Sequence, residues 1–201
     1  MFDHYAEVAA LVREKSWCVM SHGLYNTRYL GRDTDDEERS FYRDTIAMTR
    51  RHTGQTLLGM LGPCVTNGPH TPDLMAEAGL LYHADWVHDD IPVPLEVAGQ
   101  RMVTIPYHYE INDAPLLEGH FDGPAFTQFN VDQFDRLYDE ARDGGLVYCL
   151  PLHPYLIGQA HMIGHLRRLL DHICARPGLW HATGDDIARH ARRHYWPEAQ
   201  P

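Results

Sequence analysis

Apolar and polar positions alternate along the chain with two periods, one typical of helices and one typical of strands. Helices are predicted over residues 2–15, 35–52, 71–78, 124–142, 160–175 and 184–195. Strands are predicted over residues 17–21, 56–61, 80–84, 101–105, 146–152 and 179–182. Because helices and strands alternate, the pattern favours a single α/β domain over residues 1–201, with a mainly parallel sheet.

Two segments lack a clear period and are predicted to be loops. Residues 88–100 are acidic and rich in proline, and residues 107–123 contain two glycines among polar groups. Loops of this length inside a compact domain are usually functional. We therefore expect the segment 107–123 to contribute to a site.

Composition narrows the classes of protein that the chain can represent. Its formal net charge of -11 argues against a nucleic-acid binder. The four cysteines form no CxxC pair, which favours free, buried thiols over disulfides or a zinc ribbon. The sequence shows neither a signal peptide nor an apolar run that could span a bilayer, so we expect a cytoplasmic protein with no membrane partner.

Polar residues recur at the ends of the predicted strands. These positions are His22, Pro63, Asp85, Tyr107, His153 and Thr183. Since the tips of parallel strands share one edge of a sheet, two histidines and an aspartate there are compatible with an acid/base or metal site. A single histidine at a strand end is more often structural, so the argument depends on the set.

The stretch Ser21–Tyr29 directly follows the first predicted strand. Gly23 allows a turn without a Cβ clash. Asn26 is one helical turn after His22, so the two side chains are predicted to face the same point.

Five motifs in order along the chain resemble one known family. They are Ser-His-Gly-Leu-Tyr-Asn-Thr-Arg-Tyr-Leu (21–30), Leu-Gly-Pro (61–63), Ala-Asp-Trp (84–86) with Asp89 and Asp90, Ile-Asn-Asp-Ala-Pro (111–115), and Leu-His-Pro-Tyr-Leu-Ile-Gly-Gln (152–159). Together they resemble the polysaccharide deacetylase superfamily, the NodB-homology group, and are most similar to its allantoinase-like and imidase-like branch.

The resemblance implies an irregular (β/α) barrel with mainly parallel strands and a site that hydrolyses a carbon–nitrogen bond other than a peptide bond. Relatives begin with further strands that carry acidic residues, so the resemblance also implies an N-terminally truncated domain. Six strands would leave an edge of the barrel open, and we expect self-association there.

The resemblance also assigns roles to residues of this chain. His153 matches the general acid, and Asp85 and Asp89 match the residues that orient it. His22 matches a metal ligand, with zinc as the candidate ion. Asn26 stands where deacetylases have a second histidine, and an amide oxygen is a poorer zinc ligand than imidazole. Asn26 is therefore assigned to substrate binding.

Two aromatic residues and a proline complete the predicted site. Trp86 and Tyr107 could form a wall for a flat ring or a sugar face, although core packing is an equal alternative. Pro63, in the Leu-Gly-Pro motif, is assigned to the substrate-binding residues as well.

Three functional hypotheses follow. The first is a hydrolase that opens a small cyclic amide, such as allantoin or an imide. The second is a metal-dependent N-deacetylase of amino sugars. The third is an inactive homologue that binds a ligand or a partner chain.

Overall fold

A computed structural model describes residues 2–197 of the chain, and these fall into two compact units. The first unit comprises residues 2–87, 92–105 and 182–197. The second comprises residues 88–91 and 106–181. Each unit is described by itself.

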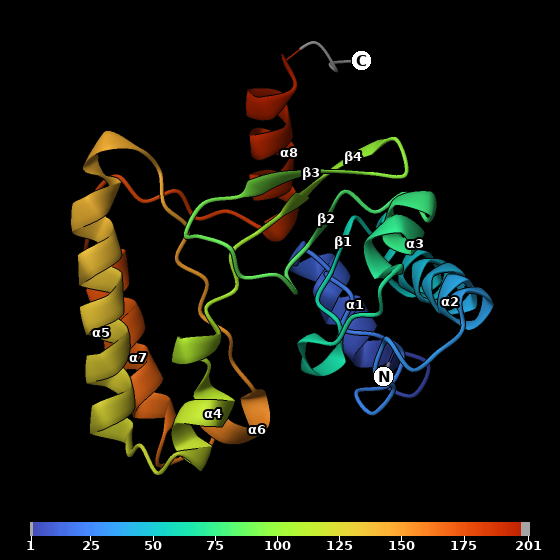
Figure 1. Cartoon of the computed structure of the whole chain (residues 1–201). Coiled ribbons are helices and arrows are strands. Elements are labelled where there is room, and N and C mark those ends of the chain that lie inside the picture. Colours follow the sequence, from blue (N-terminus) through green and yellow to red (C-terminus); the bar gives the residue numbers. More distant parts are fainter. Residues whose placement is uncertain (1, 198–201) are drawn as a thin grey trace. The chain divides into compact units, whose positions relative to one another are not determined.

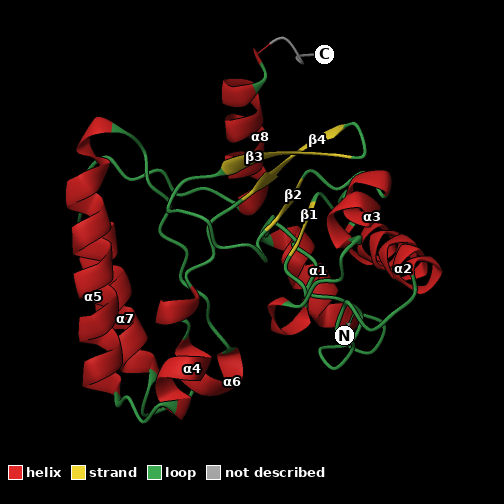
Figure 2. Ribbon diagram, in the orientation of Figure 1, coloured by secondary structure: helices red, strands yellow, loops and turns green. Residues whose placement is uncertain are grey.

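The first unit is built on a four-stranded sheet (Figures 1 and 2). Its strands lie in the order β1 (Gly59–Met60), β2 (Tyr82–His83), β4 (Gln100–Thr104) and β3 (Val93–Val97). β1, β2 and β4 run parallel, and β3 pairs antiparallel with β4. Ser21 adds one parallel bridge to Met60. The predicted α/β class with a mainly parallel sheet is confirmed, and within the described residues the strands form an open sheet.

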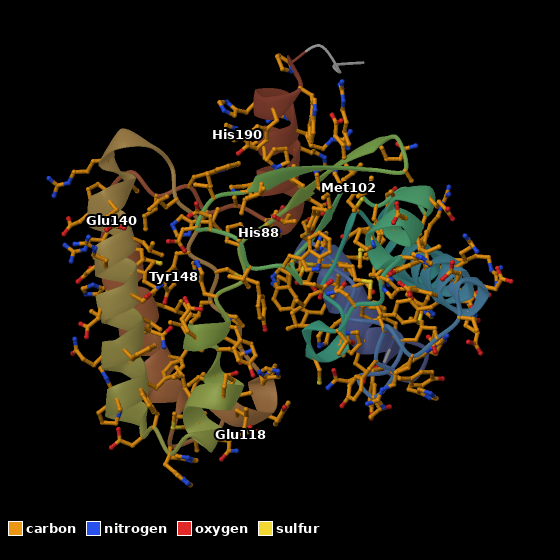
Figure 3. All side chains as sticks on the ribbon, viewed as in Figure 1. His88, Met102, Glu118, Glu140, Tyr148 and His190 are labelled. Atoms are coloured by element: carbon orange, nitrogen blue, oxygen red, sulfur yellow. The ribbon has the colours of Figure 1, made fainter. Side chains whose placement is uncertain are left out.

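Among the described residues, four α-helices belong to the first unit. They are α1 (Ala6–Glu14), α2 (Asp35–Thr53), α3 (Thr71–Glu77) and α8 (Gly184–Tyr195). α2 begins where predicted, because Thr34 and Glu37 form a reciprocal capping box. It ends at Gly54, which adopts a left-handed conformation with φ of 75°. Buried side chains from α2, α3 and the sheet form the core, among them Phe41, Met75 and Met102 (Figure 3).

The second unit is helical. It contains α4 (Asp113–Glu118), α5 (Gly123–Glu140), α6 (Pro154–Ile157) and α7 (Ile163–Cys174), with short 3-10 turns at Tyr109–Ile111 and Ala141–Asp143. α5 starts at Asp122, whose carboxylate accepts a hydrogen bond from the backbone N–H of Ala125. Phe126 of α5 and Leu169 of α7 share the core of this unit. α5 and α7 lie side by side as a helix pair (Figure 1).

Two predicted loops contain regular structure. Residues 93–100, predicted as loop, form β3 and the turn of a hairpin with β4, and this turn places Ala98 and Gly99 at φ of 48° and 71°. Two successive positive φ angles are typical of a tight hairpin turn. The strand predicted over residues 101–105 is found as β4. Pro94 obscured the strand pattern, and it is tolerated because β3 is an edge strand. In the segment 107–123, the 3-10 turn Tyr109–Ile111 and α4 replace part of the predicted loop.

The predicted strands at 146–152 and 179–182 are not found as strands. The backbone N–H of Val147 donates to the carbonyl of Asp90, and that of Cys149 donates to Nδ1 of His108. The segment 146–152 therefore bonds to non-sheet groups of the second unit. Tyr148 on this segment packs edge-on against Phe134 of α5 (Figure 3).

The four cysteines are free, as predicted, but they are not buried. Cys64 and Cys174 are exposed, and Cys18 and Cys149 are half-buried.

None of the helices in the part of the chain that the structure describes has the length and apolar character needed to cross a membrane.

The turn at Gly23 generates a first prediction. Gly23 has φ of 80°, and an added Cβ would meet Phe41 and Pro63 at 3.1 Å. We expect Gly23→Ala to lower the free energy of unfolding in urea by about 2–3 kcal/mol, from backbone strain plus crowding. The matched control is Gly54→Ala, where φ is 75° and no atom lies within 4 Å of the added Cβ. There we expect a loss of about 1 kcal/mol. Equal losses at both sites would contradict the crowding.

Candidate functional site

A histidine–carboxylate pair in the second unit is the best-defined candidate for chemistry. Nδ1 of His153 lies 2.6 Å from Oδ1 of Asp113. The backbone N–H of His153 donates to Oδ2 of the same carboxylate at 2.7 Å. Asp113 is fully buried, whereas the His153 side chain is 31% exposed. Because a carboxylate accepts the Nδ1 proton, Nε2 of His153 is left as the working nitrogen for proton transfer.

Local structure explains why the two residues meet. Asn112 caps α4 by accepting a hydrogen bond from the N–H of Ala114, which places Asp113 at the first position of the helix. A carboxylate is favoured there by the helix dipole. His153 in turn immediately precedes α6, whose first residue is Pro154. Two helix starts, 40 residues apart in sequence, thus supply the carboxylate and the imidazole.

Tyr107 contacts Asn112, the residue that caps α4. Its hydroxyl accepts a hydrogen bond from the side-chain amide of Asn112 at 2.8 Å. Only 8% of Tyr107 is exposed, and burial raises the pKa of its hydroxyl to about 12. Tyr107 therefore packs in the core and positions Asn112. Its role as a wall for substrate stays a prediction, and little of its ring is exposed to meet a substrate.

A second buried histidine, His108, lies in the same unit. Its Nδ1 accepts the backbone N–H of Cys149, so its Nε2 carries the proton and donates to Oδ1 of Asp90 at 3.0 Å. Both ring nitrogens are therefore occupied. Through these two hydrogen bonds, His108 links the segment 88–91 to the segment that precedes His153. This geometry indicates a structural role for His108.

In the first unit, His22 sits directly after the Ser21 bridge. Its Nδ1 lies 2.8 Å from the carbonyl oxygen of Leu61, so Nδ1 is the donor and Nε2 retains a lone pair. The side chain is exposed. The segment after His22 is not helical, so the predicted one-turn relation between His22 and Asn26 is wrong. Asn26 is exposed, and its role in substrate binding stays a prediction.

Asp85 is buried just beyond β2. Its Oδ1 accepts the backbone N–H of Gly62 at 2.6 Å. Its Oδ2 has no hydrogen-bond partner among the described residues and lies 3.8 Å from Nδ1 of His83. Burial raises the pKa of Asp85 to about 7, against the lowering effect of the Gly62 N–H. The carboxyl is therefore partly protonated near neutral pH.

The remaining predicted residues each have local contacts of their own. Trp86 is half-buried and meets the ring of His83 edge to face, with centroids 5.0 Å apart. Pro63 is buried and begins a short 3-10 turn. Asp89 is exposed and accepts the backbone N–H of Asp90. Their functional roles stay predictions.

The residue that orients His153 is the main departure from expectation. Asp85 and Asp89 were expected to orient it, but the carboxylate that hydrogen-bonds His153 is Asp113. Asp113 lies within the Ile-Asn-Asp-Ala-Pro motif, and the resemblance assigns it no role. The sequence signal for Asp113 is Asn-Asp-Ala-Pro (112–115). Asn is a preferred helix cap, so the carboxylate that follows it lies at the start of a helix.

The predicted metal site does not fit the described donors. Among the described residues, no three His, Cys, Asp or Glu side chains lie close enough together to hold a metal ion. His22 offers one free ring nitrogen, and its other nitrogen is occupied by Leu61. Since a zinc site in proteins uses three or four such ligands, we derive no step through a metal.

Asp85 generates a prediction about stability and pH. The folded-state pKa of about 7 lies above the ordinary 3.8, so the folded protein binds more protons between these values. Stability should therefore fall as pH rises through this window. We expect Asp85→Asn, which keeps the acceptor for Gly62, to remove this slope.

The measurement is the free energy of unfolding in urea for wild type and variant. The difference between them should change by roughly 2–3 kcal/mol between about pH 5 and about pH 8, in favour of the variant at the higher pH. Asp89→Asn, at an exposed carboxylate, is the control and should follow wild type. Parallel pH curves for wild type and Asp85→Asn would contradict the buried, protonated carboxyl.

Comparisons with known proteins place this geometry in context. No protein-family model matches the chain. A curated protein of Schizosaccharomyces pombe, named "Putative polysaccharide deacetylase", is 30% identical over 108 residues, which cover 52% of this chain and 34% of that protein.

Two crystal structures are similar over nearly the whole chain. A probable polysaccharide deacetylase from Pseudomonas aeruginosa PAO1 is 29% identical with a TM-score of 0.87, and the match covers 96% of this chain and 65% of that one. The PuuE allantoinase is 26% identical with a TM-score of 0.87, and the match covers 98% of this chain and 65% of that one. This chain thus spans less than two thirds of the length of each of these three proteins.

These similarities agree with the motifs and with the mainly parallel α/β sheet. The resemblance that the sequence predicted is confirmed. The chain has the NodB-homology fold of the polysaccharide deacetylases, with an allantoinase among the structures it resembles.

Proposed function

We propose that the protein hydrolyses a carbon–nitrogen bond other than a peptide bond, with a small cyclic amide as its favoured substrate. The observation that carries this proposal is the pair formed by His153 and Asp113. Support comes from the similarity to proteins named as a polysaccharide deacetylase and an allantoinase.

The pair suits the step in which the carbon–nitrogen bond breaks. Water adds to the carbonyl carbon, and the leaving nitrogen must gain a proton as its bond to carbon is lost. His153 can deliver that proton from Nε2, because Asp113 holds Nδ1 and stabilises the imidazolium form. The bond from the backbone N–H of His153 to Oδ2 of Asp113 fixes the carboxylate, and the contact between Nδ1 and Oδ1 then orients the ring.

The choice of a cyclic amide, such as allantoin or an imide, rests on Asn26. This residue occupies the position where the deacetylase pattern has a histidine, and the substitution resembles the allantoinase-like branch.

The alternative enzyme is a metal-dependent N-deacetylase of amino sugars. It would need ligands beyond His22, and zinc bound in stoichiometric amount by the purified protein would favour it. The alternative from another class is an inactive homologue that binds a ligand or partner chain.

The proposal also covers the location of the protein, the size of its substrate and its self-association. We propose a cytoplasmic protein that acts on a small molecule and associates with itself. The net charge of -11 supports a neutral or weakly charged substrate over an anionic polymer.

The catalytic pair can be tested by substitution. We expect wild-type protein to turn over at least one of allantoin, succinimide and an N-acetylglucosamine oligomer. His153→Ala and Asp113→Asn should each lower kcat/KM by roughly 10²–10⁴-fold, because the proton donor is lost or left unoriented. The measurement is steady-state hydrolysis of the substrate that wild type accepts.

A matched control exists on the α5–α7 pair. His172 and Asp135 form another histidine–carboxylate pair, 2.8 Å apart. We expect His172→Ala to keep kcat/KM within about twofold of wild type, since that pair has no catalytic role. Unchanged turnover in His153→Ala would refute the assigned role, and no turnover by wild type on any of the three compounds would favour the inactive homologue.

A further inference from the structure

The ring of an exposed tyrosine contacts the ring of His153. His153 and Tyr155 meet edge to face, with ring centroids 5.5 Å apart and an angle of 67° between the ring planes. Tyr155 is the second residue of α6, directly after Pro154, so this short helix fixes its backbone beside the imidazole. The histidine that we assign to proton transfer therefore has an aromatic neighbour in direct contact.

Tyr155 does not pack into the core of the second unit. It is 68% exposed, the largest fraction among the exposed large apolar side chains that the structure describes in this unit. Ile157 is the residue of α6 that is buried in that core. Single exposed aromatic residues are common on protein surfaces, so the contact with His153 is the observation that matters.

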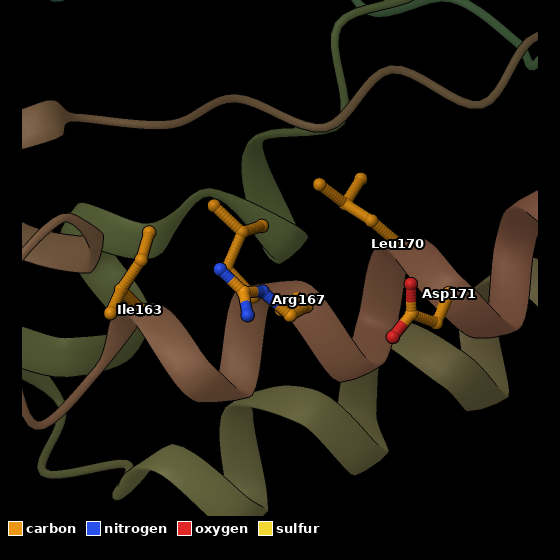
Figure 4. A pocket seen from close by; sticks show the side chains of 5 residues that line it. Ile163, Arg167, Leu170 and Asp171 are labelled. Atoms are coloured by element: carbon orange, nitrogen blue, oxygen red, sulfur yellow. The ribbon is translucent and has the colours of Figure 1, made fainter.

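The second unit has another uncovered apolar region, on α7. Leu170 is 43% exposed there. It lines a shallow hollow of about 240 Å³ together with Ile163, Leu166, Arg167 and Asp171 (Figure 4). No histidine is among these lining residues. The hollow offers apolar contact without a proton donor, so it is the competing place for a flat apolar ligand.

We infer that Tyr155 is the face on which the flat ring of a cyclic amide stacks, and that it makes the site specific for such rings. This role depends on the function proposed above, and it names the residue that holds the substrate ring. Of the two aromatic residues that the sequence predicted for this role, Tyr107 is only 8% exposed and Trp86 belongs to the first unit.

The chemistry of a cyclic amide fits a tyrosine face. Amide conjugation keeps the ring atoms of such a molecule close to one plane, and its N–H and C=O groups lie on the rim. The plane therefore stacks on an aromatic ring while the rim still forms hydrogen bonds. Since the leaving nitrogen belongs to the rim, stacking on Tyr155 would bring it toward His153. An open-chain amide has a smaller plane and would gain less from Tyr155.

The first test measures binding without turnover. Succinimide is titrated into Asp113→Asn, which keeps both rings but leaves the proton donor unoriented. The dissociation constant is taken from the shifts of the His153 imidazole signals in the NMR spectrum. These signals also report where succinimide binds, because a ligand confined to the hollow on α7 would not touch the imidazole.

Three further variants are compared in this Asp113→Asn background. Tyr155→Ala should raise the dissociation constant of succinimide roughly tenfold, because the stacking face is lost. Tyr155→Phe should stay within about twofold of the parent, because the aromatic ring remains. Leu170→Ala, in the hollow on α7, is the matched control and should bind succinimide as the parent does.

The second test separates binding from chemistry in the otherwise wild-type chain. Tyr155→Ala should raise KM for the cyclic amide about tenfold and leave kcat within about threefold, because stacking contributes to binding and not to proton transfer. Tyr155→Phe should keep both constants near those of wild type.

Four outcomes would overturn the inference. One is no shift of the His153 signals with succinimide up to roughly 100 mM, a concentration that would saturate even a millimolar site. Another is unchanged affinity in Tyr155→Ala. The third is a loss in Tyr155→Phe as large as that in Tyr155→Ala, which would assign the effect to the hydroxyl group. The fourth is an equal loss in Leu170→Ala.

Failure of this role and failure of the proposed function give different results. Succinimide binding that depends on Tyr155, with no hydrolysis by wild type, would refute the proposed function and retain the role of Tyr155. Hydrolysis of a cyclic amide with KM unchanged in Tyr155→Ala would retain the proposed function and refute the role of Tyr155.

Discussion

The two hydrogen bonds between His153 and Asp113 are the interaction on which the proposed chemistry depends. A fully buried carboxylate is costly unless its oxygens are satisfied, and here one oxygen accepts the ring Nδ1–H and the other accepts the backbone N–H. The same two bonds therefore stabilise the carboxylate and fix the imidazole. Asn112 and Tyr107 extend the arrangement into the core, so the orientation of one partly exposed ring depends on buried groups.

The histidines of this chain show how the partner of one ring nitrogen decides what the other can do. His108 is bonded at both nitrogens and holds two segments together. His22 donates Nδ1–H to the carbonyl of Leu61, and no group of metal ligands among the residues that the structure describes joins its other ring nitrogen. His153 alone among these three combines a carboxylate partner with a partly exposed ring. That combination supports the proposal that His153 is the proton donor.

The sequence predicted the features that depend on local interactions. The start of α2 follows from Thr34 and Glu37, and the turn at Gly23 follows from its missing Cβ. Features that depend on distant partners were missed. The run 146–152 has strand composition, yet its N–H groups bond to Asp90 and His108. Asp113 was missed for the same reason, since nothing within its own segment shows that His153 will lie 2.6 Å away.

The central claim is that Asp113 keeps the proton of His153 on Nδ1 and leaves Nε2 free to exchange a proton with substrate. The most direct test is the imidazole ¹⁵N NMR spectrum of His153, assigned by comparison with His153→Ala. The account predicts the Nδ1–H tautomer in wild type and its loss in Asp113→Asn. A wild-type ring protonated on Nε2 and not on Nδ1, or a tautomer unchanged by Asp113→Asn, would contradict it.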